Sequence, residues 1–448
     1  MTKLSELIAA RVPRYTSYPT APHFHPGIDP DVYRHWLQEL DPAAPLSLYI
    51  HIPFCDTLCW FCGCHTTVVN AYSPVRGYLD LLHQELDLIA AELKPGHSVT
   101  HIHWGGGSPT MLRPSDIERL GRDLRGCFSI AADAEFGIEI DPRGFNPELA
   151  AALASAGITR ASIGVQDCDP AVQRAINRIQ SMEETTRAVE LLRGVGIGNL
   201  NIDLIYGLPH QTVAGIERTV DAVLALDPDR LAIFGYAHVP HFKKHQNLIP
   251  LAALPGPEER FAQAEAAQAR LREHDYIPIG LDHFAKLGDS MANAQRRGRL
   301  ARNFQGYTTD NAPALIGLGA SSIGSFPQGY VQNLSDVPTY RAALQAGRLP
   351  VARGIALSND DRVRRHVIER LMCDLSVDLD GVAALYGKTR AMFAGPLQVM
   401  RGLAEDGIVA VDGGRITVLE PWRAATRLVC SAFDAYLDND VGRHAVAV

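Results

Sequence analysis

Short apolar segments alternate with longer segments of helical periodicity over the first half of this chain, and no other feature constrains its fold as strongly. The apolar segments are rich in Ile, Val and Tyr and mostly bounded by Gly, Pro or Asp, as is typical of buried strands. The strand candidates are Ser47–Pro53, Val99–Trp104, Glu135–Ile140, Arg160–Val165, Leu200–Ile205 and Arg230–Tyr236. The helix candidates between them are Tyr78–Leu93, Ser115–Leu124, Pro147–Ala156, Glu183–Val195 and Val213–Leu226.

The repeat of strand and helix predicts a parallel sheet, because parallel neighbours need a crossover connection that is usually a right-handed helix. A spacing of about 30 to 35 residues per unit fits a barrel or a partial barrel. We therefore expect an α/β fold whose core is a partial (β/α)6 TIM-like barrel. With its extension this domain is predicted to cover residues 46–350.

The two ends of the chain differ from this pattern. Residues 1–45 form an irregular extension that is rich in Pro and Tyr and is expected to lie over the active site. Residues 351–448 predict a mainly helical, winged-helix-like domain with two helices, a hairpin and a last helix. These elements are expected at Asp360–Met372, at Thr389–Glu405, around Ile408–Val418 and from Pro421 onward.

Composition excludes several classes of protein. Hydrophobic residues make up 46% of the 448 residues, so a large core can be buried and general disorder is excluded. The net charge of −8 disfavours a nucleic-acid-binding protein, because neutralising phosphates requires a basic surface. No apolar run reaches the roughly 18 residues of a membrane span, and the first residues do not resemble a secretory signal. We therefore expect no membrane span and a cytoplasmic protein.

Four of the eight cysteines, Cys55, Cys59, Cys62 and Cys64, lie within ten residues directly after the first strand candidate. Parallel barrels place their active sites at this end of their strands. Three thiolates spaced Cys-x3-Cys-x2-Cys can hold an iron-sulfur cubane with one iron left open for chemistry. A zinc knuckle that uses Cys64 or His65 as its fourth ligand is the alternative. The position at the first strand of a βα repeat favours the cluster.

The motif of Cys55, Cys59 and Cys62, with Phe61 directly before the third cysteine, resembles that of the radical S-adenosylmethionine (SAM) enzymes. The resemblance implies a 4Fe-4S cluster whose open iron binds the amino and carboxylate groups of SAM. It also implies that an electron from the reduced cluster breaks a carbon–sulfur bond of SAM and yields a 5′-deoxyadenosyl radical. The fold that it implies is a partial (β/α)6 TIM-like radical SAM barrel.

Longer segments resemble the oxygen-independent coproporphyrinogen III oxidases from about Pro13 to the C-terminal region. They include PRYTSYPTAPHF, SLYIHIPFCDTLCWFCGCHT, HIHWGGGSPT, SIGVQDCDPAVQRAINRIQ, NIDLIYGLP, GLDHFA and RNFQGYTT. The resemblance implies oxidative decarboxylation of two propionates of coproporphyrinogen III to vinyl groups in haem biosynthesis, giving protoporphyrinogen IX. Two alternatives remain: a haem-binding or haem-transfer protein on the same scaffold, and a radical SAM methyltransferase or cyclopropanase. Cys64 and PRYTSYPT argue against the first.

The same resemblance implies roles for individual residues. The cluster ligands are Cys55, Cys59 and Cys62, and two SAM molecules are expected. The first SAM is assigned to Tyr49, Gly106, Glu139 and Ile323. The second is assigned to Phe61, Gly107, Ser108, Gln166, Arg178, Asp203 and Ala237. Cys64 is expected beside the second SAM or the substrate without binding iron, and Gln305 is expected in the active site.

Two of these residues also stand out by their sequence context. Asp203 lies between Ile202 and Leu204 in an apolar strand candidate, where a charged group requires a partner. Gln305 belongs, with Arg14, to the family-like segments outside the strands, and Arg donors suit the carboxylates of coproporphyrinogen.

The implied partners are coproporphyrinogen III and a low-potential electron donor protein such as a flavodoxin or a ferredoxin. We expect a monomer that binds no nucleic acid. Since water must be kept from a radical, the N-terminal extension and the C-terminal domain are expected to close over the mouth of the barrel.

Overall fold

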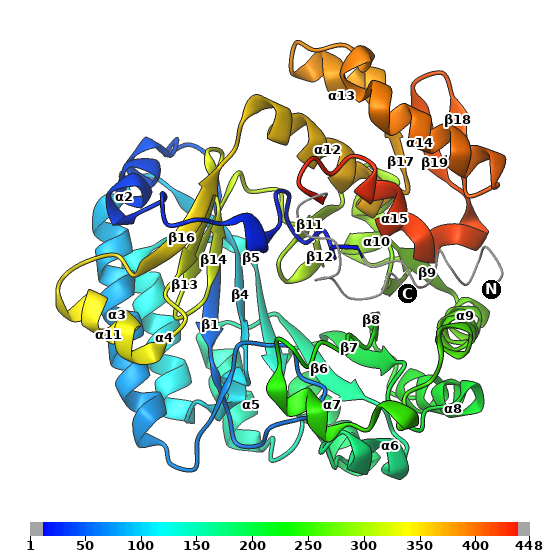
Figure 1. The fold of residues 1–448 in the computed structure, drawn as a ribbon. Coiled ribbons are helices and arrows are strands. Elements are labelled where there is room, and N and C mark those ends of the chain that lie inside the picture. Colours follow the sequence, from blue (N-terminus) through cyan, green and yellow to red (C-terminus); the bar gives the residue numbers. More distant parts are fainter. Residues whose placement is uncertain (1–11, 438–448) are drawn as a thin grey trace.

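The computed structural model describes residues 12–437 and has a central sheet of twelve strands. The six predicted strands are its middle, adjacent and parallel in chain order (Figure 1). They are β1 (Leu46–Ile52), β4 (Ser98–Gly106), β5 (Ser129–Ile140), β6 (Arg160–Gln166), β7 (Asn199–Tyr206) and β8 (Arg230–Gly235). The prediction of an α/β fold with a partial parallel barrel is confirmed.

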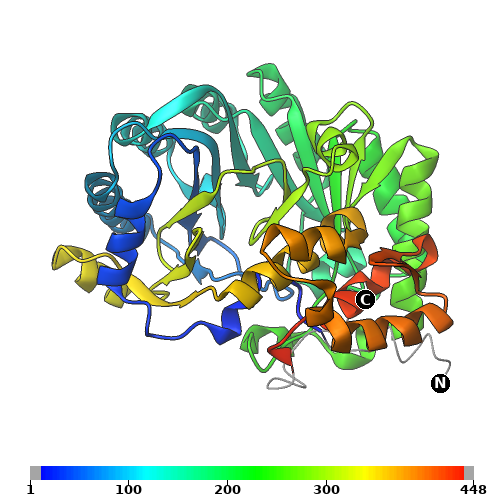
Figure 2. The ribbon, with the colours of Figure 1, turned by 90° about the horizontal axis from the view of Figure 1, so that it is seen from above.

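Helices lie between consecutive strands, on the outside of the curved sheet when it is seen from above (Figure 2). They are α3 (Ser73–Glu92), α4 (Pro114–Cys127), α5 (Pro147–Ala156), α6 (Pro170–Ala175), α7 (Met182–Gly194) and α8 (Val213–Leu224). Local sequence sets where they begin: Ser181 and Glu184 form a capping box on α7, and Thr212 caps α8. No helix within residues 12–437 is long and apolar enough to cross a membrane.

The sheet extends beyond the six predicted strands at both edges. β13 (Ala314–Leu318) runs parallel beside β1, and the antiparallel strands β14 (Ile323–Ser325), β15 (Gly329–Asn333) and β16 (Val351–Ala356) follow it. The antiparallel β10 (His283–Lys286) and β9 (Tyr276–Ile279) extend the edge at β8. The prediction of six strands was therefore incomplete, because these added strands are short and most follow one another without helical crossovers.

The remaining α-helices and strands before residue 350 connect or cover this sheet. They are α2 (Pro30–Glu39), β2 (Phe54–Cys55), β3 (Thr67–Val68), α9 (Pro257–Glu273), α10 (Ser290–Arg296), β11 (Ala301–Asn303), β12 (Gly306–Thr308) and α11 (Val337–Gln345).

The C-terminal part packs around a second hydrophobic cluster and contains helices with a three-stranded sheet in the order β17-β19-β18. Its elements are α12 (Asn359–Asp374), β17 (Ser376–Asp378), α13 (Leu379–Leu385), α14 (Ala394–Glu405), β18 (Val409–Asp412), β19 (Arg415–Val418) and α15 (Thr426–Ser431). Two predicted helices were too long, since 3-10 turns at Arg390–Phe393 and Glu420–Ala425 precede α14 and α15. The domain boundaries at residues 45 and 350 stay predictions.

Candidate active site

The cysteine loop begins directly after β1. Its two ends are held together by β2 and β3, which pair in parallel. Backbone hydrogen bonds reinforce this closure: Thr67 N–H donates to Pro53 O at 2.7 Å, and Val69 N–H donates to Cys55 O at 3.0 Å. The loop therefore lies at the carboxyl end of the parallel strands, where barrels of this kind assemble their sites.

A cavity of about 230 Å³ lies beside this loop, and the carboxyl ends of the neighbouring parallel strands contribute to its wall. The predicted site residues that line it are Cys55, Cys59, Phe61, Cys62, Cys64, Gly106, Gly107, Glu139, Gln166, Arg178 and Asp203. Residues from six separate strands and loops thus converge on one space, although the sequence separates some of them by more than a hundred positions. Their individual roles stay predictions.

The other predicted site residues lie outside this cavity. The Tyr49 ring is buried on β1 and its hydroxyl is 2.9 Å from His51 Nδ1. Ser108 is buried, with its hydroxyl 3.0 Å from that of Thr110. Ile323 packs against an aromatic cluster that contains Phe24 and Tyr330. Ala237 and Gln305 line a different cavity, which is described below.

Two arginines surround the sulfur of Cys59. Arg178 Nη1 lies 3.6 Å from Cys59 Sγ, and Arg143 Nη2 lies 3.9 Å from it. Both guanidinium groups also contact Asp141, at 3.1 Å from Arg178 and 2.6 Å from Arg143. Although burial acts in the opposite direction, these two arginines hold the pKa of Asp141 below its usual value. The arrangement places positive charge against a thiolate, which fits a cysteine that binds iron.

The other two ligand candidates differ in their acidity. A hydrogen bond with Cys64 lowers the pKa of Cys62 to about 7, whereas burial raises the pKa of Cys55 to about 11. Within residues 12–437 no three His, Cys, Asp or Glu side chains stand close enough together to hold a single metal ion. A cubane is held through separate irons, so its cysteines need to line one space rather than meet at one point. The three thiols meet that requirement.

Polar side chains from adjacent strands form the floor of the cavity. Asp203 on β7 accepts hydrogen bonds from Ser162 Oγ at 2.8 Å and from Asn201 Nδ2 at 2.7 Å. Burial raises the pKa of Asp203. Glu139 on β5 accepts a hydrogen bond from the backbone N–H of Gly106 on β4 at 3.0 Å. As expected, Asp203 is not left unpaired in its apolar strand.

The triple glycine at the end of β4 packs closely against the protein itself. A Cβ atom on Gly105 would lie 2.8 Å from the Glu139 carboxylate, and one on Gly107 would lie 2.6 Å from the backbone oxygen of Phe54. Gly106 has a positive φ of 121°, which favours glycine. These glycines therefore allow close packing between β4, β5 and the cysteine loop, whether or not a ligand also approaches them.

Comparison with known proteins places this geometry in a family. Residues 49–223 match the family model described as the radical SAM superfamily. An oxygen-independent coproporphyrinogen III oxidase from Bradyrhizobium diazoefficiens is 48% identical over 98% of this chain and 97% of the relative. The same enzyme from Paracoccus denitrificans is 44% identical over 99% of this chain and 98% of the relative. The chain belongs to the oxygen-independent coproporphyrinogen III oxidases.

The fold of a solved structure supports the same family. The radical SAM enzyme coproporphyrinogen III oxidase from Escherichia coli superimposes with a TM-score of 0.90 at 40% identity, covering 94% of this chain and 97% of that chain. This oxidase is thus a radical SAM oxidoreductase, and its cofactors are a 4Fe-4S cluster and SAM. These cofactors favour a cluster over a zinc knuckle at the cysteine loop, and the assignment of Cys55, Cys59 and Cys62 as the ligands stays a prediction.

Sequence reasoning missed a segment of this oxidase that holds the cysteine loop from the opposite side. Lys243 Nζ donates to Cys64 O at 2.7 Å, and His245 Nε2 lies 2.8 Å from Cys62 O. Gln246 Nε2 donates to Phe61 O at 3.0 Å. Lys243 had no expected role, because exposed lysines are usually solvated. Arg143 was missed as well, although its position two residues after Asp141 at a strand end was a usable signal.

Proposed function

We propose that this oxidase converts two propionate side chains of coproporphyrinogen III to vinyl groups, giving protoporphyrinogen IX without dioxygen. The observation that carries the proposal is the convergence of the three cysteines with Glu139 and Asp203 on one cavity at the carboxyl ends of the strands. The near full-length identity to oxidases of this name supports the same reaction.

When bound, the cluster and SAM supply a carbon radical that removes a hydrogen atom from the β-carbon of a propionate. Cys55, Cys59 and Cys62 would bind three irons and leave the fourth for SAM. The Glu139 carboxylate, held by the Gly106 N–H, offers an acceptor for the ammonium or ribose hydroxyls of that SAM. Loss of carbon dioxide and of one electron, which passes to an acceptor, then leaves the vinyl group.

The second SAM would lie toward Gln166 and Asp203. Gln166 has a positive φ of 72° at an irregularity in β6, which turns its side chain out of the regular register. Arg178, which already contacts Asp141, can add a donor for a carboxylate. Cys64 carries no iron in this arrangement and faces the same cavity. Phe61 offers an aromatic face for the adenine.

We also propose the electron donor, the oligomeric state and the location of this oxidase. A low-potential protein such as a flavodoxin or a ferredoxin would reduce the cluster, and the enzyme would act as a monomer in the cytoplasm. Its substrate carries several carboxylates, so the site requires basic groups beyond the cysteine cavity.

The test is turnover by protein purified without oxygen, supplied with a reductant, SAM and coproporphyrinogen III. We expect protoporphyrinogen and 5′-deoxyadenosine to form together. Absence of both products from protein with full iron and sulfide content would refute the proposal. Tight stoichiometric haem binding without turnover would instead support a haem-transfer function.

A further inference from the structure

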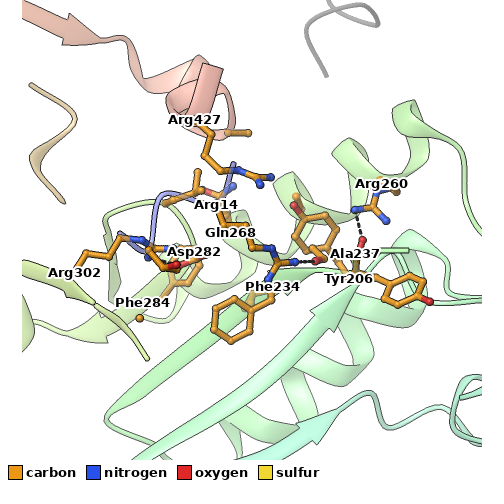
Figure 3. Close-up of a pocket in the computed structure, with 18 of the residues that line it drawn as sticks. Arg14, Tyr206, Phe234, Ala237, Arg260, Gln268, Asp282, Phe284, Arg302 and Arg427 are labelled. Atoms are coloured by element: carbon orange, nitrogen blue, oxygen red, sulfur yellow. Dashed lines mark hydrogen bonds and ion pairs between the residues drawn. The ribbon is translucent and has the colours of Figure 1, made fainter. Parts of the chain in front are cut away.

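A second cavity, of about 240 Å³, gathers four arginines from parts of the chain that are distant in sequence (Figure 3). Arg14 comes from the N-terminal extension, Arg260 from α9, Arg302 from β11 and Arg427 from α15. Asp282 is the only acidic residue among the described residues that line this cavity. Four guanidinium groups therefore face one carboxylate.

The Asp282 carboxylate already contacts neighbouring side chains. Its Oδ1 lies 2.8 Å from His283 Nδ1 and 4.0 Å from Arg302 Nη1. Burial raises its pKa, but the His283 hydrogen bond and the charges of Arg302 and Arg14 outweigh it and bring the pKa to about 2. Asp282 is therefore ionised near neutral pH, and the cavity keeps an excess of positive charge.

Arg302 has unused hydrogen-bonding capacity. Its side chain is 7% exposed, and its Nε and Nη1 atoms are buried without a hydrogen-bond partner among the described residues. The guanidinium carbon lies 4.5 Å from the centre of the Tyr307 ring, which fixes its orientation. A buried donor without a partner is costly, so an anionic ligand in this cavity would find a donor ready at Arg302.

The other arginines border the same space. Arg14 Nη2 donates to Gly235 O, the last residue of β8, at 3.2 Å, and Arg260 Nη2 donates to O of the next residue, Tyr236, at 2.9 Å. Burial, followed by the charge of Arg14, lowers the pKa of Arg427 to about 10. Arg427 therefore remains a cation near pH 7. Arginines gathered in this way repel one another, and a bound anion relieves the repulsion.

The arginine cavity is distinct from the cysteine cavity. It shares Phe234 and Gln305 with a middle cavity of about 220 Å³. The middle cavity in turn shares Glu139, Ser162 and Asp203 with the cysteine cavity. The arginine cavity and the cysteine cavity have no lining residue in common. A carboxylate held by the arginines therefore lies one cavity away from the cysteines, although Ala237 and Gln305 also line the arginine cavity.

The volume of the arginine cavity limits the size of the group that it can bind. A cavity of about 240 Å³ is smaller than the roughly 300 to 1,000 Å³ of pockets that enclose a whole drug-sized ligand. It can take short carboxylate arms but not a whole macrocycle. Arginine suits this task, because its planar fork binds a carboxylate through two parallel hydrogen bonds.

We propose that Arg14, Arg260, Arg302 and Arg427 bind the propionate groups of the tetrapyrrole that do not react and are retained in the product. This inference rests on the proposed function, since it takes coproporphyrinogen III as the substrate. It assigns these arginines to positioning the macrocycle so that a different propionate points toward the cysteine cavity.

The test compares binding of substrate and product under anaerobic conditions. Equilibrium dialysis of coproporphyrinogen III and of protoporphyrinogen IX, followed by oxidation and fluorescence, gives both dissociation constants without turnover. The variants are Arg427→Gln, Arg302→Gln and the conservative Arg427→Lys. Arg218→Gln is the matched control, because the Arg218 side chain is 68% exposed and lies outside the three cavities.

We expect Arg427→Gln and Arg302→Gln to weaken binding of substrate and product equally, by roughly 10- to 100-fold, the value of one or two charge-assisted hydrogen bonds. Arg427→Lys should recover part of the affinity, and Arg218→Gln should bind normally. Weakened binding of the substrate alone would overturn the proposal, because the arginines would then hold reacting propionates. Unchanged binding in both glutamine variants, or equal loss in Arg218→Gln, would also overturn it.

Turnover of the wild-type protein separates this inference from the proposed function. If the wild type binds both tetrapyrroles but forms no product, the function fails and the carboxylate cavity stands. If it forms product while the glutamine variants bind like the wild type, only the cavity assignment fails. Thermal unfolding of each variant controls for loss of fold.

Discussion

Arg178 places its Nη1 atom 3.6 Å from the sulfur of Cys59, while the same atom lies 3.1 Å from Asp141. A positive charge beside a cluster ligand favours the reduced, more negative state of the cluster. Replacing Arg178 with Gln is therefore expected to lower the reduction potential. One charge at this distance is worth about 1 to 4 kcal/mol, which corresponds to a decrease of roughly 40 to 170 mV for a one-electron couple.

A potentiometric titration followed by electron paramagnetic resonance measures this shift. Arg218→Gln is the control, since its side chain is exposed and pairs only with Asp169, at 3.7 Å, among the ion pairs of the described residues. An unchanged potential in Arg178→Gln would contradict the electrostatic role. A raised KM for SAM in the same variant would support the predicted SAM contact independently of the potential.

The spacing of the cysteines leads to a second prediction. Cys62→Ala is expected to lose the cluster and all turnover, because two thiolates cannot hold a cubane with one open iron. Cys64→Ser should keep iron and sulfide close to the wild-type content while losing activity. Cys127→Ser is the control, since Cys127 lies at the end of α4, where its thiol contacts Asp87 at 3.8 Å. Loss of iron from Cys64→Ser would make Cys64 a ligand and contradict its assignment.

The close packing at Gly107 predicts a structural effect. A methyl group there would lie 2.6 Å from Phe54 O and 2.8 Å from Phe54 N, both backbone atoms of the cysteine loop. Gly107→Ala should therefore shift the loop and cost about 1 to 3 kcal/mol of stability, as overpacking usually does. In Gly126→Ala, a helix position with nothing within 4 Å, stability should stay the same or rise slightly. Thermal unfolding and iron content measure both effects, and equal behaviour of the two variants would refute the interpretation.

Glu85 predicts a dependence of stability on pH. This buried carboxylate on α3 accepts hydrogen bonds from Gly319 N–H, Asn333 Nδ2 and Tyr340 OH, each at 2.6 Å. Burial nevertheless raises its pKa to about 7. Because the folded protein holds this proton more tightly than the unfolded chain, its contribution is complete below about pH 4.5 and is lost as the pH rises through 7. The loss amounts to about 3 kcal/mol.

The measurement is the midpoint of thermal unfolding between pH 5 and pH 8, for the wild type and Glu85→Gln. The part of the slope that comes from Glu85 should disappear in the variant, whose amide does not titrate. Glu217→Gln, at an exposed position of α8, should keep the wild-type slope. An identical slope in wild type and Glu85→Gln would contradict the shifted pKa.

The parallel part of the fold could be predicted from the sequence. Strands that are buried on both faces appear there as apolar runs, and segments of helical periodicity separate them. The strands β13–β16 were not predicted, since strands as short as Ile323–Ser325 are too short to show a periodic pattern of apolar residues. The cysteine loop was located by spacing alone. The arginine cavity was not predicted, because Arg14 and Arg427 lie near opposite ends of the chain and only the fold brings them together. Local patterns give no indication of such pairs.

The two ends of the described chain are fastened to each other. Tyr15 OH donates to Asp434 at 3.0 Å, the Tyr18 hydroxyl accepts from Ala435 N–H at 3.0 Å, and both rings belong to the C-terminal hydrophobic cluster. Arg14 is adjacent to Tyr15, so the wall that it adds to the arginine cavity depends on residues more than four hundred positions away. Shortening this oxidase at its carboxyl end would therefore damage a surface that is encoded at its amino end.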